Sequence, residues 1–556
     1  MQAAVSKYKP RVIFCIITLL YSATYFFVFK GFNGTDDLHY AMLAARMVNG
    51  NYNPFSSGDI FSGRILLIAW QALLYYVGGV HVFTTQLSTL LAVVFACYLT
   101  VFSLLRASTA ATACIASAMF YFNPVLFNAA KGIFPDIYVI ICGVITLIFW
   151  NKSLQQIPVF KNILYGAGIG LALVAGIFFK ETILVFFVLL VCLAFIYRSR
   201  QAAITSLAML GTLAVCGALV AVWYYHYTGN VLFRLAQVKN SSYLNPCSYD
   251  ALPSSYLVAR LTYEPWKGFI IFGFYPVVLA AALIIYNLFL YKPLEIFKNS
   301  FVLCFFILLA TGLYFPFSLN GYQPLCGDVR HFLFLLPLAV CAVAPYITAN
   351  IETAKTAKWF FAAGITCPVC VAATGDKWQW MIWGLMAVYF LLTKLVAAKI
   401  SIAFKTVAFA AVLWLCMPYQ LFYNNSNWFS NITQLNRQLT GSYYYFPDHD
   451  NMMHWQLLHG FNSNIHMYDL DSSPFKIFRL YYEKMDTSVF HPGWLLVNTK
   501  YIARSPAYLH SIDSLQKSGY FTQQQTVGNV RALYLATPSR LSYIQQLTAN
   551  DVKVVR

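Results

Sequence analysis

The sequence predicts an all-α polytopic membrane protein with about thirteen transmembrane helices, amphipathic helices on the outer side and a small α/β C-terminal periplasmic domain. Three observations support this prediction. The 556-residue chain is 60% hydrophobic and only 10% charged, with a mean hydropathy of +0.62, whereas a soluble domain carries about 25% charged residues. Apolar runs long enough to cross a bilayer recur over the first three quarters of the chain. The rest is rich in Asn, Ser and Tyr, and its apolar runs are short.

The composition also excludes several classes of protein. A cytosolic enzyme, a secreted disulfide scaffold and a disordered regulator are all ruled out by so apolar a chain. The net charge of +18, from 37 Lys and Arg against 19 Asp and Glu, would suggest nucleic acid in a soluble protein. In a membrane protein, basic residues gather in cytoplasmic loops and face anionic lipid. We therefore expect membrane lipids as partners and no nucleic acid.

A transmembrane helix needs about 20 apolar residues, and sometimes about 17. The first such segment is preceded by Lys7, Lys9 and Arg11 and has no small-residue cleavage site, so we interpret it as a signal anchor. The predicted spans, in chain order, are 12–30, 83–105, 107–123, 134–150, 163–179, 182–197, 203–224, 268–290, 300–319, 332–349, 358–374, 379–396 and 404–420.

The distribution of basic residues predicts the orientation. With the N-terminus in the cytoplasm, the short basic loops all fall inside, as the positive-inside rule requires; they carry Arg106, Lys152 and Lys161, Arg198 and Arg200, Lys292 and Lys298, Lys355 and Lys358, and Lys399 and Lys405. An odd number of spans places residues 421–556 outside. We therefore predict a transmembrane catalytic domain at 1–420 and a C-terminal domain at 421–556, which is of ordinary domain size.

Acidic residues before position 421 lie almost entirely on the predicted outer side, with Glu295 and Glu352 as the exceptions. Acids have little influence on topology, so this one-sidedness indicates a polar outer cavity. The outer connections 31–82 and 225–267 are long and mix aromatic with charged residues. We expect amphipathic helices in them, around 40–48 and 231–236, with plain surface loops as the alternative.

The first outer connection begins with an acidic pair, Asp36 and Asp37, followed by His39 and Tyr40. One acid is explained by capping the following helix, but two are not. We therefore interpret the pair as a general base, with a divalent cation site as the alternative. Arg64 follows in the same connection. Its guanidinium suits either the phosphate of a lipid substrate or phospholipid headgroups.

Further charged residues mark the outer ends of later spans. Asp136 opens the fourth span, where an acid is energetically costly unless it is paired or faces water. The alternative to a functional role is that Asp136 forms a purely structural ion pair with Lys131. Lys180 and Glu181 lie between two apolar runs, where they could simply neutralise each other. The glycines between Gly166 and Gly170 indicate close helix packing and not a phosphate loop, since no Lys-Ser/Thr follows.

The sequence Cys326-Gly-Asp328-Val-Arg330-His331 places an Arg-His pair at the outer end of another span. The neighbouring acid makes a polar site a better interpretation than a simple anchor. Cys247 and Cys326 both lie in outer connections, and a disulfide between them is one open possibility.

At these residues the sequence resembles the glycosyltransferase C superfold, in the branch of the protein O-mannosyltransferases and the lipid A aminoarabinose transferase. The shared features are the acidic pair with Tyr40 after the first span, the segments Ala44-Ala-Arg46-Met and Gly50-Asn-Tyr52, and a later basic residue matched by Arg64. Asp136 matches a further acid of the family, and the Lys180–Glu181 turn matches a turn that carries a lysine. The family also has a span with the pattern Arg-aromatic-Leu-Leu-Pro, which is matched by Arg330-His331-Phe-Leu-Phe-Leu-Leu-Pro337.

The resemblance implies a glycosyltransferase that takes a sugar from a polyprenyl-phosphate donor and inverts its anomeric centre. Asp36 would deprotonate the acceptor hydroxyl, and Asp37 would orient the acceptor or the sugar. Asp136 would bind sugar or acceptor. The acceptor would be lipid A, a surface glycan such as lipopolysaccharide, or a protein, at the outer face of a bacterial inner membrane.

The same resemblance assigns the basic residues to the departing lipid phosphate, with Arg64, Lys180 and Arg330 in that role. The remaining substrate-binding candidates are His39, Tyr40, Lys131, Glu181 and His331. Two departures from the family pattern, Asp37 in place of Glu and His331 in place of Tyr, leave the sugar and the acceptor unassigned. The alternative functions are a transporter or flippase of a lipid-linked saccharide, an oligosaccharide ligase that uses a pyrophosphate lipid, and an assembly subunit.

Overall fold

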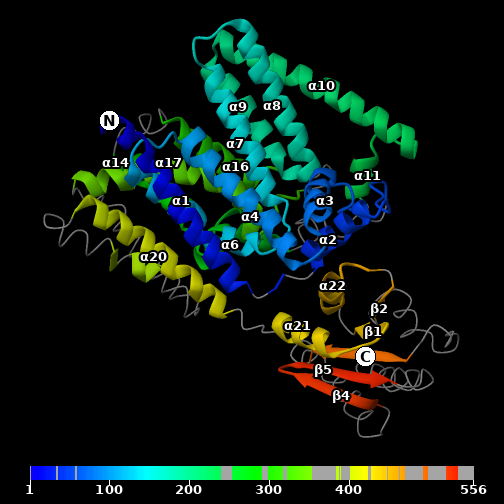
Figure 1. Ribbon diagram of the computed structural model, residues 1–556. Coiled ribbons are helices and arrows are strands. Elements are labelled where there is room, and N and C mark those ends of the chain that lie inside the picture. The colour runs from blue at the N-terminus through cyan, green and yellow to red at the C-terminus, as the bar shows by residue number, and fades with distance from the viewer. Residues whose placement is uncertain are drawn as a thin grey trace. The chain divides into compact units, whose positions relative to one another are not determined.

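The computed structural model describes most of the chain and its helices and strands are drawn in Figure 1. The described residues are 2–29, 31–32, 35–56, 59–239, 253–290, 299–316, 322–353, 383–386, 388–389, 401–423, 428–446, 449–462, 464–469, 492–498 and 521–535. The predicted span at 358–374, most of that at 379–396, and Cys247 lie outside them.

The chain divides into two compact units. The first comprises residues 1–28, 53–69 and 88–423, and the second comprises 29–52, 70–87 and 424–556. The structure thus groups residues 29–52 and 70–87, most of which belong to the first predicted outer connection, with the C-terminal region. The domain boundary at 420/421 stays a prediction.

The first unit is helical. Its helices, two of them only in part, are α1 (Gln2–Val28), α3 (Ile65–Gly78), α4 (Val82–Tyr98) with the π-helical continuation η1 (Leu99–Leu104), α5 (Ala110–Tyr121), α6 (Pro124–Ala130), α7 (Asp136–Ser153), α8 (Val159–Phe179), η2 (Glu181–Ile183), α9 (Leu184–Tyr197), α10 (Arg200–Thr228), α11 (Phe233–Lys239), α12 (Ser254–Leu261), α13 (Glu264–Ile271), α14 (Tyr275–Leu290), α16 (Ser300–Tyr314), η5 (Val329–Leu335), α17 (Leu336–Thr353) and α20 (Ile402–Tyr423).

Six helices of the described residues are long and apolar enough to cross a membrane, or seven if α5 and α6, bent by 59° at a short break, form one span. The described residues also contain shorter apolar helices: Glu181–Tyr197, Tyr275–Ile285, Ser300–Tyr314 and Ile402–Leu415, which overlap predicted spans, and Ile65–Gly78, which lies in the predicted outer connection 31–82. The prediction of many apolar helices is confirmed, and their total of about thirteen stays a prediction.

The bend between α5 and α6 has a local cause. Asn123 has an extended backbone, its side-chain oxygen accepts a hydrogen bond from the Leu126 amide at 3.0 Å, and Pro124 occupies the first helical position. Both features start a new helix. The short outer connection predicted at this point therefore contains α6, and the last residues of that connection lead directly to Asp136.

Glycines set the distance between α8 and α10, which run alongside each other (Figure 1). A Cβ atom added at Gly166 would lie 2.4 Å from the carbonyl oxygen of Thr205, and one at Gly170 would lie 2.7 Å from Cβ of Thr212. The predicted role of this glycine-rich segment in close helix packing is confirmed.

Among the described residues, the second unit contains a small mixed sheet, three whole helices and parts of α3 and α4. The strands are β1 (Tyr443–Phe446), β2 (His466–Asp469), β3 (Gly493–Asn498), β4 (Phe521–Val527) and β5 (Val530–Leu535), in the order β2-β1-β3-β5-β4. β1 pairs in parallel with β2 and β3, whereas β5 pairs antiparallel with β3 and β4. With α21 (Trp428–Gln438) and α22 (His449–Leu458), the C-terminal region has the predicted α/β character.

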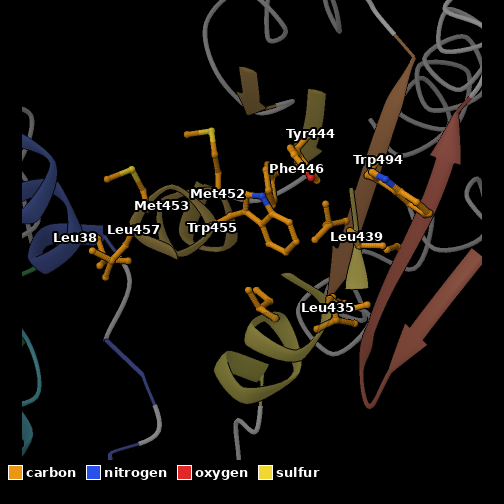
Figure 2. Close-up of a cluster of buried hydrophobic side chains, with 14 of the residues drawn as sticks. Leu38, Leu435, Leu439, Tyr444, Phe446, Met452, Met453, Trp455, Leu457 and Trp494 are labelled. Atoms are coloured by element: carbon orange, nitrogen blue, oxygen red, sulfur yellow. The ribbon is translucent and has the colours of Figure 1, made fainter. Parts of the chain in front are cut away.

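The third helix of this unit is α2 (Thr35–Val48), which carries the acidic pair and packs on α22. One hydrophobic core unites the unit. Figure 2 shows Trp455 of α22 pointing toward Tyr444 and Leu439, and Leu38 of α2 belongs to the same cluster. The Trp455 and Tyr444 rings lie 5.0 Å apart, and Leu38 is fully buried. The acidic helix is therefore part of the C-terminal fold and not an isolated surface helix.

Cys326 forms a disulfide bond. Its predicted partner, Cys247, lies outside the described residues. A disulfide is expected on the oxidising side of a membrane, which agrees with the predicted outer position of Cys326.

The helix packing can be tested at two glycines. We expect Gly166→Val to lower the free energy of unfolding by about 1–3 kcal/mol, because the added side chain would push α8 away from α10. Gly211→Val is the matched control, since a Cβ atom there meets nothing within 4 Å. Thermal unfolding of both variants in detergent measures the difference. Equal unfolding temperatures would contradict the packing role of Gly166.

Candidate functional site

Six of the predicted site residues meet in the first unit as one group of charges. They come from the start of α7, the α8–α9 junction, the η5 helix and the segment before α3: Arg64, Asp136, Lys180, Glu181, Arg330 and His331. We call these residues, together with Arg234, the charge cluster.

The centre of the charge cluster is a buried ion pair. Lys180 lies between α8 and η2 with an extended backbone, and its Nζ donates to Asp136 Oδ1 at 2.6 Å. The two side chains are 10% and 4% exposed. Asp136 is the first residue of α7, where the helix dipole also favours a negative charge.

His331 completes this centre. Its Nδ1 lies 2.8 Å from Lys180 Nζ and 3.5 Å from Asp136 Oδ1. An ammonium group only donates, so Nδ1 accepts this hydrogen bond and the ring proton lies on Nε2. His331 is a buried part of the charge cluster and not a surface anchor.

Arg330 is held beside the other oxygen of Asp136, with its Nε 3.9 Å from Oδ2. Its guanidinium stacks on the Phe134 ring at 4.1 Å and also faces Asp328 at 3.6 Å. Asp328 caps η5 by accepting from the Arg330 amide at 2.9 Å. Asp136 Oδ2 is buried and has no hydrogen-bond partner among the described residues, so an acceptor oxygen remains beside a guanidinium.

Glu181 binds two arginines from other segments. Arg234 of α11 donates to Glu181 Oε1 through Nε at 2.9 Å and through Nη2, and Arg64 Nη2 lies 3.8 Å from Oε2. The interpretation of Lys180 and Glu181 as a self-neutralising pair is therefore wrong. Each has its partner on another element, because the backbone turns between the two residues.

Arg234 and Gln237 were not predicted as site residues. Arg234 donates to the carbonyl of Ile60 at 2.8 Å, and the Gln237 amide donates to the carbonyls of Ser56 and Asp59 at 2.6 and 2.8 Å. α11 thereby fixes the segment that leads to Arg64. The sequence signal that could have indicated Arg234 is its position as the one basic residue in the expected amphipathic helix around 231–236.

Lys131 is not the ion-pair partner of Asp136, as the structural interpretation of Lys131 had suggested. Its Nζ donates to Asn128 Oδ1 at 3.1 Å and lies 5.7 Å from the Phe127 ring centre. Asp136 receives its lysine partner from the α8–α9 junction, 44 residues away in sequence. The role of Lys131 in substrate binding stays a prediction.

The acidic pair belongs to the second unit. Asp36 and Asp37 occupy the first turn of α2, where carboxylates are favoured by the helix dipole. Asp37 is fully buried and accepts from the Leu38 amide at 2.9 Å, whereas Asp36 is partly exposed. Tyr40 is fully buried and His39 partly exposed. The pair is thus divided into one accessible and one enclosed carboxylate.

An apolar cavity of about 380 Å³ lies next to Arg234. Its wall is formed by side chains of α8, α9 and α10, among them Ile177, Phe187 and Val220, and Gly63 and Arg234 also line it. A Cβ atom at Gly63 would lie 2.2 Å from Arg234 Nη1, so glycine lets the guanidinium approach the backbone there.

The charge cluster is rich in positive charge. Arg64, Lys180, Arg234 and Arg330 face the carboxylates of Asp136 and Glu181. Burial lowers the pKa of Lys180 below its ordinary value; Asp136 opposes this shift, and Arg64 and Arg330 add to it. A cluster with surplus cations favours an anion, and guanidinium groups suit phosphate.

The described residues contain no group of three or more His, Cys, Asp or Glu side chains that could hold a metal ion. The divalent cation left open by the sequence thus stays an untested alternative. No chemical step is assigned to it.

No protein-family model matches the sequence, and no curated protein matches it. Solved structures do match. ArnT from Cupriavidus metallidurans bound to undecaprenyl phosphate aligns over 94% of this chain and 97% of its own, with 13% identity and a TM-score of 0.55. The chain has the ArnT fold.

The apo structure of the same ArnT gives a similar result, with 13% identity, 95% and 98% coverage and a TM-score of 0.52. An apo oligosaccharyltransferase from Archaeoglobus fulgidus is more distant, with 10% identity, 96% and 75% coverage and a TM-score of 0.46. The two ArnT structures confirm the resemblance at the level of the fold alone.

The buried ion pair can be tested through stability. We expect Lys180→Met to lower the free energy of unfolding by about 3–5 kcal/mol, since it leaves the Asp136 carboxylate buried without its lysine. The double variant Lys180→Met/Asp136→Asn should lose less, because the buried charge is also removed. Denaturant unfolding in detergent measures both. The control is Lys161→Met, an exposed lysine on α8; an equal effect at both lysines would contradict the pairing.

Proposed function

We propose that the protein is an integral membrane glycosyltransferase that moves a sugar from a polyprenyl phosphate to an acceptor hydroxyl, with inversion, at the outer face of a bacterial inner membrane. One observation supports this most: four cations, Arg64, Lys180, Arg234 and Arg330, gather in the charge cluster, and one of them, Arg234, also lines an apolar cavity. A phosphate on an isoprenoid chain would match both features, with its phosphate at the cations and its hydrocarbon chain in the apolar cavity.

The chemistry needs this arrangement of charge. As the acceptor oxygen bonds to the anomeric carbon, the bond from that carbon to the phosphate oxygen breaks, and negative charge develops on the polyprenyl phosphate. Preorganised cations stabilise that charge in the transition state. Lys180 and Arg330 are the cations next to Asp136, whose buried Oδ2 has no hydrogen-bond partner among the described residues. We assign Asp136 to a hydroxyl of the sugar or acceptor.

The acidic pair supplies the proton acceptor in this proposal. Asp36 takes the proton of the acceptor hydroxyl, because it is the accessible carboxylate of the two. Asp37 is buried, and in this proposal it orients the acceptor or the sugar. The division of roles therefore follows the difference in burial between adjacent side chains.

The likeness to ArnT supports the identity of the lipid. That protein was solved with undecaprenyl phosphate bound, and we infer the same class of lipid phosphate for this chain. Lipid A, a surface glycan and a protein remain the candidate acceptors. The sugar is left to the experiment.

The proposal is tested by donor turnover. Purified protein in lipid is incubated with a panel of undecaprenyl-phosphate sugars and acceptor extract, and the release of free undecaprenyl phosphate is measured. We expect Asp36→Asn to slow release by about 10²–10⁴-fold, the usual contribution of a general base. Glu264→Gln, an exposed acid on α13, is the matched control and should keep full activity.

Binding of the product lipid separates the alternatives. We expect wild type and Asp36→Asn to bind undecaprenyl phosphate equally, and Arg330→Gln to bind it about tenfold more weakly, because a charge-assisted contact is lost. Donor binding without release from any donor would support a flippase. Release only from a pyrophosphate-linked glycan would indicate an oligosaccharide ligase.

The titration of Lys180 gives a pH dependence. Its lowered pKa means that the ammonium is lost at a lower pH than in an ordinary lysine, so affinity for undecaprenyl phosphate should fall as the pH rises toward that pKa. The measurement runs from about pH 7.5 to about pH 10, where the phosphate itself stays doubly charged because its second pKa is about 6. Lys180→Arg should retain affinity over this range, since a guanidinium keeps its proton. An identical fall in both proteins would contradict the role of Lys180.

A further inference from the structure

A second basic pocket lies at the other end of the α9–α10 hairpin. It has a volume of about 430 Å³ and is lined by Ala194 and Phe195 of α9, by Arg198 and Ser199 of the turn, and by Arg200, Ala203 and Ser206. α9 begins directly after η2 and runs from Leu184 to Tyr197. At about 1.5 Å per residue, the pocket is therefore roughly 20 Å along this helix from Lys180.

The pocket has positive charge that the described residues do not neutralise. No carboxylate among them forms an ion pair with Arg198 or Arg200, and both arginines are exposed. Arg198 donates through Nε to the carbonyl of Phe195 at 3.1 Å, which leaves its two terminal nitrogens for a ligand. The charge cluster, by contrast, contains carboxylates within reach of its cations.

The local backbone adds further donors. Arg198 ends α9 in the left-handed conformation, with φ of 40°, and Ser199 caps α10 by accepting from the Ala202 amide at 3.1 Å. The chain therefore reverses sharply here, and Arg200 is the first residue of the 29-residue helix α10. The hydroxyl of Ser206 lines the pocket and has no hydrogen-bond partner among the described residues.

The surroundings are apolar. Phe195 is 70% exposed, and Ile196 and Leu207 are 52% and 70% exposed. Acyl chains can pack against such exposed apolar side chains, and a phosphodiester can accept hydrogen bonds from the guanidinium groups of Arg198 and Arg200. Free phosphate would satisfy the arginines but would leave the apolar side chains without a partner.

We propose that this pocket binds the headgroup of an acidic phospholipid, with Arg198 and Arg200 on its phosphate and Phe195 and Leu207 against its acyl chains. The site is separate from that of the donor lipid. The basic-loop rule places it on the cytoplasmic side, where anionic lipids concentrate. The bound lipid stabilises the turn between α9 and α10 by contacting its lipid-facing side.

The test measures lipid retention by the full-length protein. Native mass spectrometry in detergent compares cardiolipin, phosphatidylglycerol and phosphatidylcholine as probes. We expect the acidic lipids to bind wild type, and Arg198→Gln/Arg200→Gln to weaken this binding at least about tenfold, as expected when hydrogen bonds to a charged group are lost. Phosphatidylcholine should bind both proteins weakly and equally.

The matched control is Arg106→Gln/Lys152→Gln, which removes the same charge from other turns of the predicted cytoplasmic side. Arg106 also has a left-handed backbone, with φ of 55°, and like Lys152 it is exposed. Equal weakening by both double variants would overturn the proposal in favour of general surface charge. Displacement of the lipid by inorganic phosphate at equal concentration would overturn it in favour of a free-anion site.

Folding is checked by the unfolding temperature in lipid-free detergent, where the two double variants should match wild type. If Arg198→Gln/Arg200→Gln proves unstable there, Arg198→Lys/Arg200→Lys replaces it. That variant keeps the charge but not the paired nitrogens of the guanidinium, so we expect it to retain only part of the affinity. Full affinity for acidic lipid after the loss of both charges would overturn the proposal.

Discussion

The ion pair between Lys180 and Asp136 is the interaction on which the first unit depends. It joins the α8–α9 junction to the start of α7, and His331 brings η5 to the same point. All three groups are buried. Charges at such a depth are stable only when they are paired and hydrogen bonded, so the pair specifies how these helices meet. It also keeps Arg330 in place beside the remaining oxygen of Asp136.

A second layer of pairing extends this centre toward the outer connections. Glu181, adjacent to Lys180 in the chain, binds Arg234 and faces Arg64. α11 in turn holds the segment before Arg64 through Gln237. The cations assigned to phosphate are thus preorganised by carboxylates and carbonyl groups. Such fixed charges cost little reorganisation when negative charge develops on a leaving group.

Much of this could be predicted from the sequence. Asp136 stands out because an acid at the start of a span is costly unless it is paired or faces water, whereas Lys180 and Arg330 match motifs of the glycosyltransferase C superfold. Their pairing was not predicted. Lys131 is near Asp136 in sequence, but the partner is Lys180, because the extended backbone at the α8–α9 junction directs that side chain inward. Such long-range pairing depends on tertiary structure and leaves no local pattern.

The composition of the second unit has a consequence for biosynthesis. Residues 29–52, which follow the first helix, share a core with Trp455 and strand β3 near the end of the chain. α2 emerges from the ribosome hundreds of residues before its packing partner α22. Contacts so distant in sequence form late and slowly. The acidic pair therefore acquires its final environment only after nearly the whole protein has been translated and inserted, so a prematurely terminated chain would lack that environment.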